Sequence, residues 1–321
     1  MTTAREIADT GAQILTAVRT VVVGMDDPLE IALASILAGG HVLFEDVPGL
    51  GKTLAARSLA SALGLSFRRL QCTPDMLPGD VTGSYVYAPD SGEFVFRPGP
   101  IFTGLLLADE INRTTPKTQS AMLEAMAERQ VTVEGNSFPL PAPFHVIATS
   151  NPIEFEGTYA LPEAQLDRFM VRLSIGYPEA EGEAQILQNR VLRQEEATHV
   201  PSVVDAPRLA ELQAAVEAIH VDQDITRYCV EIVRATRGAP QVEVGASPRG
   251  SLGLVLLGRA LAALDGRDFV RPDDIKRIAV PVLAHRLTLT PQAWSQGASA
   301  ADVVRSVIGQ IAVPPTVRAL G

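Results

Sequence analysis

The chain has 321 residues, 46% of them apolar, with a formal net charge of −10 and a pI near 5.1. A chain longer than about 250 residues is expected to fold as two domains. The acidic balance disfavours a broad nucleic-acid-binding surface, which is usually basic, although it permits a local basic patch or pore.

The sequence indicates neither a membrane span, nor a secretion signal, nor a disulfide bond. Its longest uncharged apolar stretch, residues 31–44, is shorter than the roughly 18 residues of a membrane span. The first residues lack the basic and apolar segments of a secretion signal, so we expect a cytoplasmic protein without a membrane span. Cys72 and Cys229 stand far apart without a CxxC partner, which predicts two buried thiols.

The first half of the chain alternates between helical and strand patterns, as a layered sheet with crossover helices requires. Apolar residues at helical spacing predict helices over residues 7–23, 28–38 and 54–63. Short apolar runs predict strands over residues 41–44, 67–70, 104–108 and 145–148. Turn residues predict two hairpins, with strands at 84–87 and 93–96 and at 130–133 and 138–140. We therefore expect a mostly parallel sheet covered on both faces.

After Tyr177-Pro178 the pattern changes to long helices without buried-strand runs. Helices are predicted over residues 181–193, 207–218, 225–237, 248–264 and 272–286. The change places a domain boundary between about residues 176 and 185, with an α/β domain over residues 1–178 and a smaller helical domain over residues 179–321.

A glycine-rich loop, residues 46–53, lies between the predicted strand 41–44 and the helix 54–63. Backbone N–H groups of such a loop bind phosphate, and the helix dipole adds partial positive charge. In this motif Lys52 reaches the β- and γ-phosphates and the Thr53 hydroxyl binds Mg²⁺. Asp46 stands where the full motif has glycine, which leaves an ordinary strand-to-helix turn as the alternative. The expected cofactors are ATP or ADP and Mg²⁺, with contacts from Val47, Pro48, Gly49, Leu50, Gly51, Lys52, Thr53 and Leu54.

A second motif stands at the end of the apolar run 105–108, where two carboxylates follow one another. Asp109 is predicted to hold the metal together with Thr53, and Glu110 to orient and deprotonate the attacking water. The structural alternative is a helix cap at Asp109 and a surface charge at Glu110.

Three segments resemble the signatures of MoxR-type AAA+ ATPases: Asp-Glu-Ile-Asn-Arg at 109–113, Ala-Thr-Ser-Asn-Pro at 148–152, and residues 156–169. The resemblance runs from about Val22 to Leu287. It implies a P-loop NTPase core with a parallel sheet, a helix-2 insert and a pre-sensor hairpin, and a smaller all-α lid. It also implies a homo-oligomer, expected as a hexamer, with chaperone-like action on a protein client, often one with a von Willebrand factor A domain.

The resemblance further implies roles for single residues. Asn151 matches the first sensor, which contacts the γ-phosphate or the lytic water, and Arg249 matches the second sensor at the start of a lid helix. Arg168 matches the arginine finger that enters a neighbouring subunit's site in trans. An Asn-Pro turn and two surface arginines are the corresponding structural alternatives. Adenine is expected near Val23 and Gly24, although a Val-Val-Val run also suits a core.

Other functions stay open from the sequence. The same branch contains the ATPase subunits of metal chelatases. A nucleic-acid motor is disfavoured by the acidic balance and by a total of three lysines. A slow nucleotide-dependent switch or scaffold is a third alternative. The hairpin aromatics Tyr85, Tyr87, Phe94 and Phe96 are predicted either to pack on the body of the protein or to engage the client.

Overall fold

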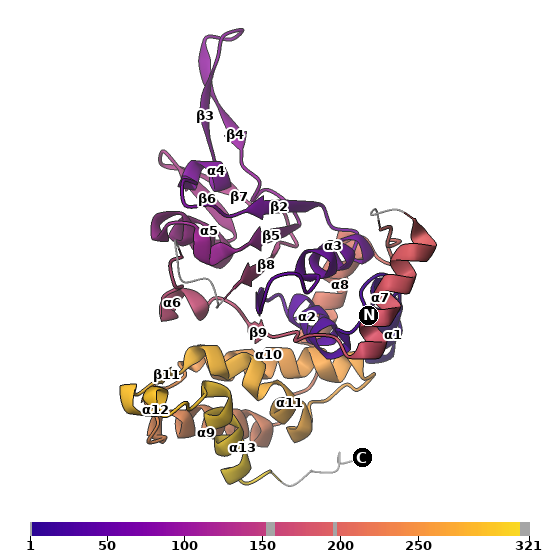
Figure 1. The fold of residues 1–321 in the computed structure, drawn as a ribbon, viewed down its shortest axis with the longest axis vertical. Coiled ribbons are helices and arrows are strands. Elements are labelled where there is room, and N and C mark those ends of the chain that lie inside the picture. Colours follow the sequence, from indigo (N-terminus) through magenta and orange to yellow (C-terminus); the bar gives the residue numbers. More distant parts are fainter. Residues whose placement is uncertain (1, 152–157, 195–197, 315–321) are drawn as a thin grey trace.

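The computed structural model describes residues 2–151, 158–194 and 198–314 (Figure 1). Pro152 and the Glu156-Gly157 part of the signature segment lie outside the described residues. In the view of Figure 1 the hairpin of residues 83–98 projects upward from the α/β half, the helices of residues 223–310 lie beneath that half, and the helices of residues 180–217 lie beside it.

A five-stranded sheet forms the centre of the α/β half, in the order β2-β5-β8-β1-β9, and each pairing is parallel. The strands are β1 (Val42–Glu45), β2 (Phe67–Gln71), β5 (Leu105–Asp109), β8 (His145–Ser150) and β9 (Val171–Leu173). Four of them confirm the predicted strands. Strand β9 was not predicted from the sequence, because a strand of three residues is too short to produce a pattern.

Both faces of the sheet are buried, as the uninterrupted apolar runs predict. In β5, Leu105 and Leu107 join the core that contains helices α1 (Ala4–Arg19) and α3 (Lys52–Ala62), whereas Leu106 and Ala108 join a second core with helix α5 (Pro116–Glu128). The helices of this half are α1 (Ala4–Arg19), α2 (Asp26–Leu37), α3 (Lys52–Ala62), α4 (Pro78–Thr82), α5 (Pro116–Glu128) and α6 (Glu163–Leu166). Thr3 and Glu6 begin α1 with a capping box.

The helical half confirms the expected lid and adds a short strand pair. Its helices are α7 (Ala180–Arg193), α8 (Ala206–Glu217), α9 (Gln223–Gly238), α10 (Pro248–Leu264), α11 (Pro272–Leu283), α12 (Pro291–Ser295) and α13 (Ala300–Gln310). The antiparallel strands β10 (Val242–Val244) and β11 (Thr288–Leu289) were not predicted from the sequence, since each is only two or three residues long.

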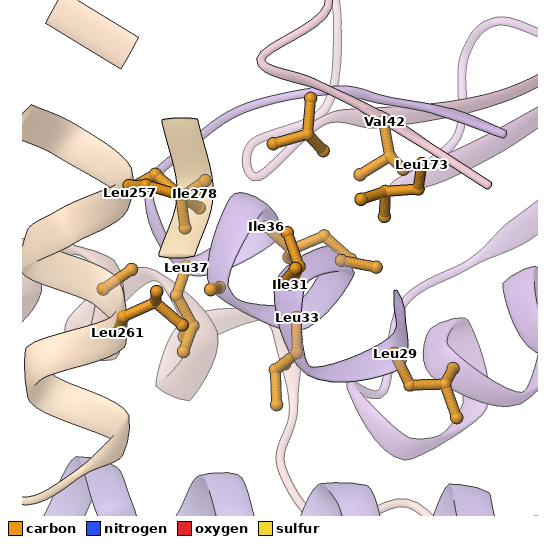
Figure 2. Close-up of a cluster of buried hydrophobic side chains, with 14 of the residues drawn as sticks. Leu29, Ile31, Leu33, Ile36, Leu37, Val42, Leu173, Leu257, Leu261 and Ile278 are labelled. Atoms are coloured by element: carbon orange, nitrogen blue, oxygen red, sulfur yellow. The ribbon is translucent and has the colours of Figure 1, made fainter. Parts of the chain in front are cut away.

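Helix α2 joins the two halves, because apolar side chains surround it. Figure 2 shows Ile36 directed toward Val42 and Leu173 of the sheet, while Leu37 lies beside Leu257 and Leu261 of α10. Since one buried cluster includes residues of α1, α2, α10 and α11, this core is continuous between the two halves of the chain. The domain boundary near residue 178 stays a prediction.

The two predicted hairpins are present, and they pack against each other. They consist of β3 (Gly83–Ala88) with β4 (Glu93–Pro98), and of β6 (Gln130–Val133) with β7 (Asn136–Pro139). The rings of Phe96 and Phe138 stack at 3.9 Å between centroids, and Asn136 Nδ2 donates to Tyr85 Oη at 3.0 Å. Tyr87 and Phe94, nearer the hairpin tip, are 50% and 69% exposed. Two of the four aromatic residues therefore pack, and two remain exposed.

Cys72 and Cys229 are both buried, as expected, and burial raises the pKa of each thiol to about 12. Among the helices that the structure describes, none has the length and apolar character to cross a membrane.

Candidate functional site

The glycine-rich loop connects the end of β1 with the start of α3, as the sequence predicts. Gly49 and Gly51 adopt left-handed conformations, with φ of 84° and 79°. Glycine suits both positions because other residues pay a steric penalty there. Gly51 directly precedes α3, so the backbone N–H groups of the first helical turn face the loop.

Lys52 is nearly buried beneath the loop. Its Nζ donates to the carbonyl oxygen of Asp46 at 2.6 Å and to that of Ser150 at 3.5 Å. Burial lowers the pKa of Lys52, and the nearby carboxylates of Asp46 and Asp109 oppose that shift. The ammonium group therefore lies where the carboxyl ends of β1 and β8 meet.

Asp46, the departure from the glycine motif, ties the loop to the segment after β9. One carboxylate oxygen accepts hydrogen bonds from Ser174 Oγ at 2.8 Å and from the N–H groups of Ile175 and Gly176 at 2.7 Å each. The other oxygen accepts from Val47 N at 2.8 Å. Burial would raise the pKa of Asp46, but these hydrogen bonds outweigh it and the pKa is lowered.

Asp109 and Thr53 converge from neighbouring elements. Thr53 Oγ1 donates to Asp109 Oδ2 at 3.2 Å, and Thr149 Oγ1 donates to Asp109 Oδ1 at 2.7 Å. Protein sites for Mg²⁺ commonly supply one or two oxygen ligands and leave the rest to phosphates and water. The hydroxyl of Thr53 and the carboxylate of Asp109 fit that donor set.

Glu110 has a left-handed backbone, with φ of 57°, immediately after β5. Its N–H donates to Thr149 Oγ1 at 2.8 Å, and its carboxylate accepts from Gln71 Nε2 at 2.9 Å and Arg113 NH1 at 3.0 Å. A left-handed residue other than glycine costs free energy, so the surrounding contacts hold this conformation.

Three polar residues of the site were not singled out by sequence reasoning. Thr149 holds both Asp109 and Glu110, Gln71 holds Glu110, and Arg69 lies 2.7 Å from Asp109 Oδ2 in an ion pair. Arg69 and Gln71 are two residues apart on β2, so their side chains lie on the same face of the strand. The pairing of β2 with β5 brings them to Asp109 and Glu110. The only signal in the sequence is that Thr149 belongs to the segment before Asn151.

These elements enclose a cavity of about 190 Å³ at the carboxyl ends of the strands. It is lined by Pro48, Gly49, Leu50, Gly51, Lys52, Thr53, Asp109, Glu110, Thr149, Ser150 and Asn151. Asn151 is 4% exposed and follows β8 directly. The structure thus brings the predicted loop, carboxylates and first sensor together.

The predicted adenine contacts lie outside that lining but beside the loop. A side chain at Gly24 would meet Pro178 Cβ at 3.3 Å, and one at Gly51 would meet Met25 Cε at 3.2 Å. The segment around Val23 and Gly24 therefore borders both the loop and the start of the helical half. Val47 and Leu54 flank the lining residues along the chain. An adenine site here stays a prediction.

Arg168 and Arg249 do not line the cavity either. Arg168 NH1 donates to the carbonyl oxygen of Leu123 at 3.0 Å. Arg249 is 57% exposed along its side chain and lies 3.8 Å from a carboxylate oxygen of Asp167. Because Asp167 directly precedes Arg168, the two arginines share one region of the surface.

The chain is similar to known proteins in both sequence and structure. Residues 41–171 match the model of the ATPase family associated with various cellular activities (AAA), and residues 234–307 match that of the AAA lid domain. Uncharacterized protein YeaC of Bacillus subtilis is 48% identical over 92% of both chains. Chaperone MoxR1 of Mycobacterium tuberculosis is 42% identical over 92% of this chain and 80% of its own. The crystal structure of a candidate ATPase from Cytophaga hutchinsonii, 36% identical, superposes with a TM-score of 0.90 over 97% of both chains.

Proposed function

Because the chain belongs to the MoxR-type AAA+ ATPases, we propose that it hydrolyses ATP in the cavity between the glycine-rich loop and the ends of β5 and β8. One observation carries the proposal: a phosphate-binding loop, two successive carboxylates and Asn151 line a single cavity. Each of these groups has a role in phosphoryl transfer to water.

The loop N–H groups and Lys52 bind the β- and γ-phosphates, and Thr53 with Asp109 holds Mg²⁺. When bound, the metal would neutralise the negative charge that develops on the phosphates. Glu110 orients the attacking water and accepts its proton, while Thr149 keeps the backbone of Glu110 in place. Asn151 contacts the γ-phosphate or the water.

We further propose that the working form is a homo-oligomer, in the expected hexameric state. Arg168 lies outside the cavity of its own subunit, and a ring of identical chains would bring it to the next subunit's γ-phosphate. In related phosphoryl-transfer systems, an arginine supplied in this way increases the rate by about 10³ to 10⁵.

The output we propose is chaperone-like remodelling of a protein client, since a relative with 42% identity is named a chaperone. Loss of the γ-phosphate would release the contacts that fix the lid relative to the α/β half, so hydrolysis would move the lid. The client is expected to include proteins with a von Willebrand factor A domain. ATP-loaded Glu110→Gln protein is the reagent for capturing it, because a subunit that cannot hydrolyse keeps its bound state.

Glu110→Gln also tests the catalytic assignment. We expect ATP binding to be retained and turnover to fall by at least about 100-fold, because the amide cannot accept a proton. Binding is measured with a fluorescent nucleotide, and turnover by phosphate release. The matched control is Glu124→Gln, the same change at an exposed position of α5, which should keep the wild-type rate. Unchanged turnover in the Glu110→Gln protein would contradict the assignment.

A further inference from the structure

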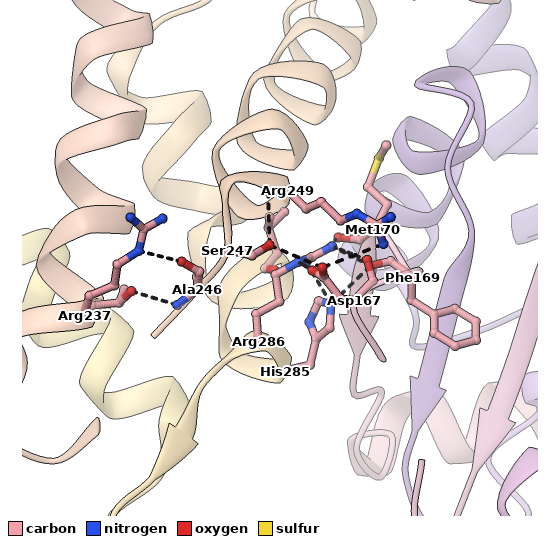
Figure 3. Close-up of polar contacts among 11 residues, drawn as sticks. Asp167, Phe169, Met170, Arg237, Ala246, Ser247, Arg249, His285 and Arg286 are labelled. Carbon is pink, nitrogen blue, oxygen red and sulfur yellow. Dashed lines mark hydrogen bonds and ion pairs between the residues drawn. The ribbon is translucent and has the colours of Figure 1, made fainter. Parts of the chain in front are cut away.

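Asp167 lies at the junction between the α/β half and the helical half (Figure 3). Its Oδ1 accepts a hydrogen bond from Arg286 Nε at 2.7 Å. Its Oδ2 accepts from Ser247 Oγ at 3.2 Å and lies 3.8 Å from Arg249 NH1. One carboxylate of the α/β half therefore contacts three residues of the helical half.

Arg286 hydrogen-bonds to the backbone on both sides of Arg168. Its NH2 group donates to the carbonyl oxygens of Asp167, at 3.3 Å, and of Phe169, at 2.8 Å. Its NH1 group donates to the carbonyl oxygen of Met170 at 3.3 Å and to that of Val282. The side chain of Arg286 is 4% exposed, so burial stabilises a single arrangement of these hydrogen bonds.

Ser247 connects the same carboxylate to Arg249. Its hydroxyl accepts a hydrogen bond from Arg249 N at 3.1 Å at the start of α10, and it donates to Asp167. The first turn of α10 is thus held against the segment that carries Arg168. Since Arg168 and Arg249 belong to different halves of the chain, Asp167 and Arg286 set the position of one relative to the other.

From these contacts we infer that Asp167 and Arg286 form a positioning pair that presents Arg168 and Arg249 together to the γ-phosphate bound in a neighbouring subunit. The inference rests on the proposed function, because it requires a shared site. Neither member of the pair lines the cavity of its own subunit. Movement of the lid that carries Arg286 would displace the segment on both sides of Arg168, so the state of the lid in one subunit would control hydrolysis in the next.

Mixed oligomers of full-length chains test this inference, because an intact partner can rescue a defect that acts on the neighbour's site. Asp167→Asn removes the negative charge that pairs with Arg249 and Arg286, and keeps one side-chain oxygen as a hydrogen-bond acceptor. We expect KM for ATP within about twofold of wild type and turnover reduced at least about tenfold. The pure Asp167→Asn and Glu110→Gln oligomers should both be slow.

Equal mixing of Asp167→Asn and Glu110→Gln chains should restore turnover. Random assembly joins an intact Glu110 to intact arginines of the partner at about one site in four, so we expect about a quarter of the wild-type rate. A defect confined to the subunit's own site could not be rescued, because the chain with the intact glutamate would still carry the change. A mixture as slow as its components would overturn the inference.

Arg168→Ala mixed with Glu110→Gln distinguishes this result from failure of the shared site. If that reference mixture does not recover, the proposed shared site is wrong. If it recovers while the Asp167→Asn mixture does not, only the positioning role is wrong. Arg286→Lys is the second variant: lysine keeps the charge but cannot reproduce the guanidinium geometry, so it should also be slow and rescued.

A matched control is available at another ion pair between the two halves. Glu30 of α2 accepts from Arg277 of α11 at 3.0 Å, far along the chain from Arg168. Glu30→Gln makes the same carboxylate-to-amide change as Asp167→Asn. It should assemble and turn over ATP at the wild-type rate without mixing. A tenfold loss of turnover in Glu30→Gln would show that any weakened contact between the halves suffices, and would overturn the specific role of Asp167.

Discussion

Asp46 replaces a glycine of the usual phosphate-binding motif, and its contacts give that replacement a structural role. Its carboxylate accepts four hydrogen bonds, three of them from the segment 174–176 that leaves β9. Lys52 in turn donates to the carbonyl oxygen of Asp46. At the scale of single residues, the loop is therefore held by the segment that leads into the helical half, as well as by its own glycines.

Asp46→Asn should reduce the free energy of unfolding at pH 7 by about 1–3 kcal/mol, because an amide nitrogen would face N–H donors. The pKa of Asp46 is lowered in the folded state, so its stabilisation is present above the unfolded pKa of about 3.9 and is lost as the pH falls through the folded value. The difference between wild type and variant should therefore shrink below about pH 4. Urea unfolding at several pH values measures it, and a difference independent of pH would contradict this account.

At the scale of elements, the two hairpins form a single unit with a packed base and an exposed end. Phe96 of β4 stacks on Phe138 of β7 with an interplanar angle of 11°. Tyr87 and Phe94 form an edge-to-face pair nearer the tip, with ring centroids 5.6 Å apart. The β3–β4 hairpin projects from the body in Figure 1, so the exposed pair that it carries is accessible to another protein.

Phe96→Ala and Phe94→Ala form a matched pair on one strand. We expect Phe96→Ala to reduce the free energy of unfolding by about 1–3 kcal/mol, because it removes a stacked ring. Phe94→Ala should change that free energy by less than about 0.5 kcal/mol, since its ring is mostly exposed. Chemical denaturation measures both. Equal effects of the two changes would contradict the division of the hairpin into a packed base and an exposed end.

The exposed pair also predicts a functional difference. In the Glu110→Gln background loaded with ATP, Phe94→Ala should reduce capture of the client while nucleotide binding stays unchanged. Client capture equal to that of the parent trap would exclude the hairpin tip as the contact surface.

At the scale of the whole molecule, the continuous core around α2 connects the nucleotide cavity with the lid. Leu37 contacts the helical half, whereas the same helix packs on β1 and β9 beside the loop (Figure 2). The Asp167 cluster forms a second connection (Figure 3). Motion of the lid would therefore act on both the cavity and the two arginines that we propose reach the neighbouring subunit.

A shared site predicts that ATP turnover per mole of chain rises with protein concentration as subunits assemble. Arg168→Ala should stay slow at every concentration, because assembly no longer supplies the arginine. Phosphate release is measured beside sedimentation velocity, which reports the fraction assembled. A constant specific activity over a range in which the oligomer dissociates would contradict the shared site.

Local patterns in the sequence were sufficient for much of the fold and for the centre of the candidate site. The strand-loop-helix unit around Lys52, the two carboxylates at the end of β5 and the turns of both hairpins each depend on residues close together in the chain. Periodicity and turn chemistry report such short-range preferences directly.

Contacts between distant segments were decided only by the tertiary structure. The pairing of β2 with β5 brings Arg69 to Asp109, the segment after β9 donates to Asp46, and the return of the lid brings Arg286 to Asp167. These residues are separated by 40, 130 and 119 positions, respectively. Composition and spacing carry no record of such pairs, because strand order and the packing of the whole core determine which side chains meet. The sequence by itself therefore determined the groups that we propose bind and hydrolyse ATP, and the tertiary structure determined which residues hold those groups in place.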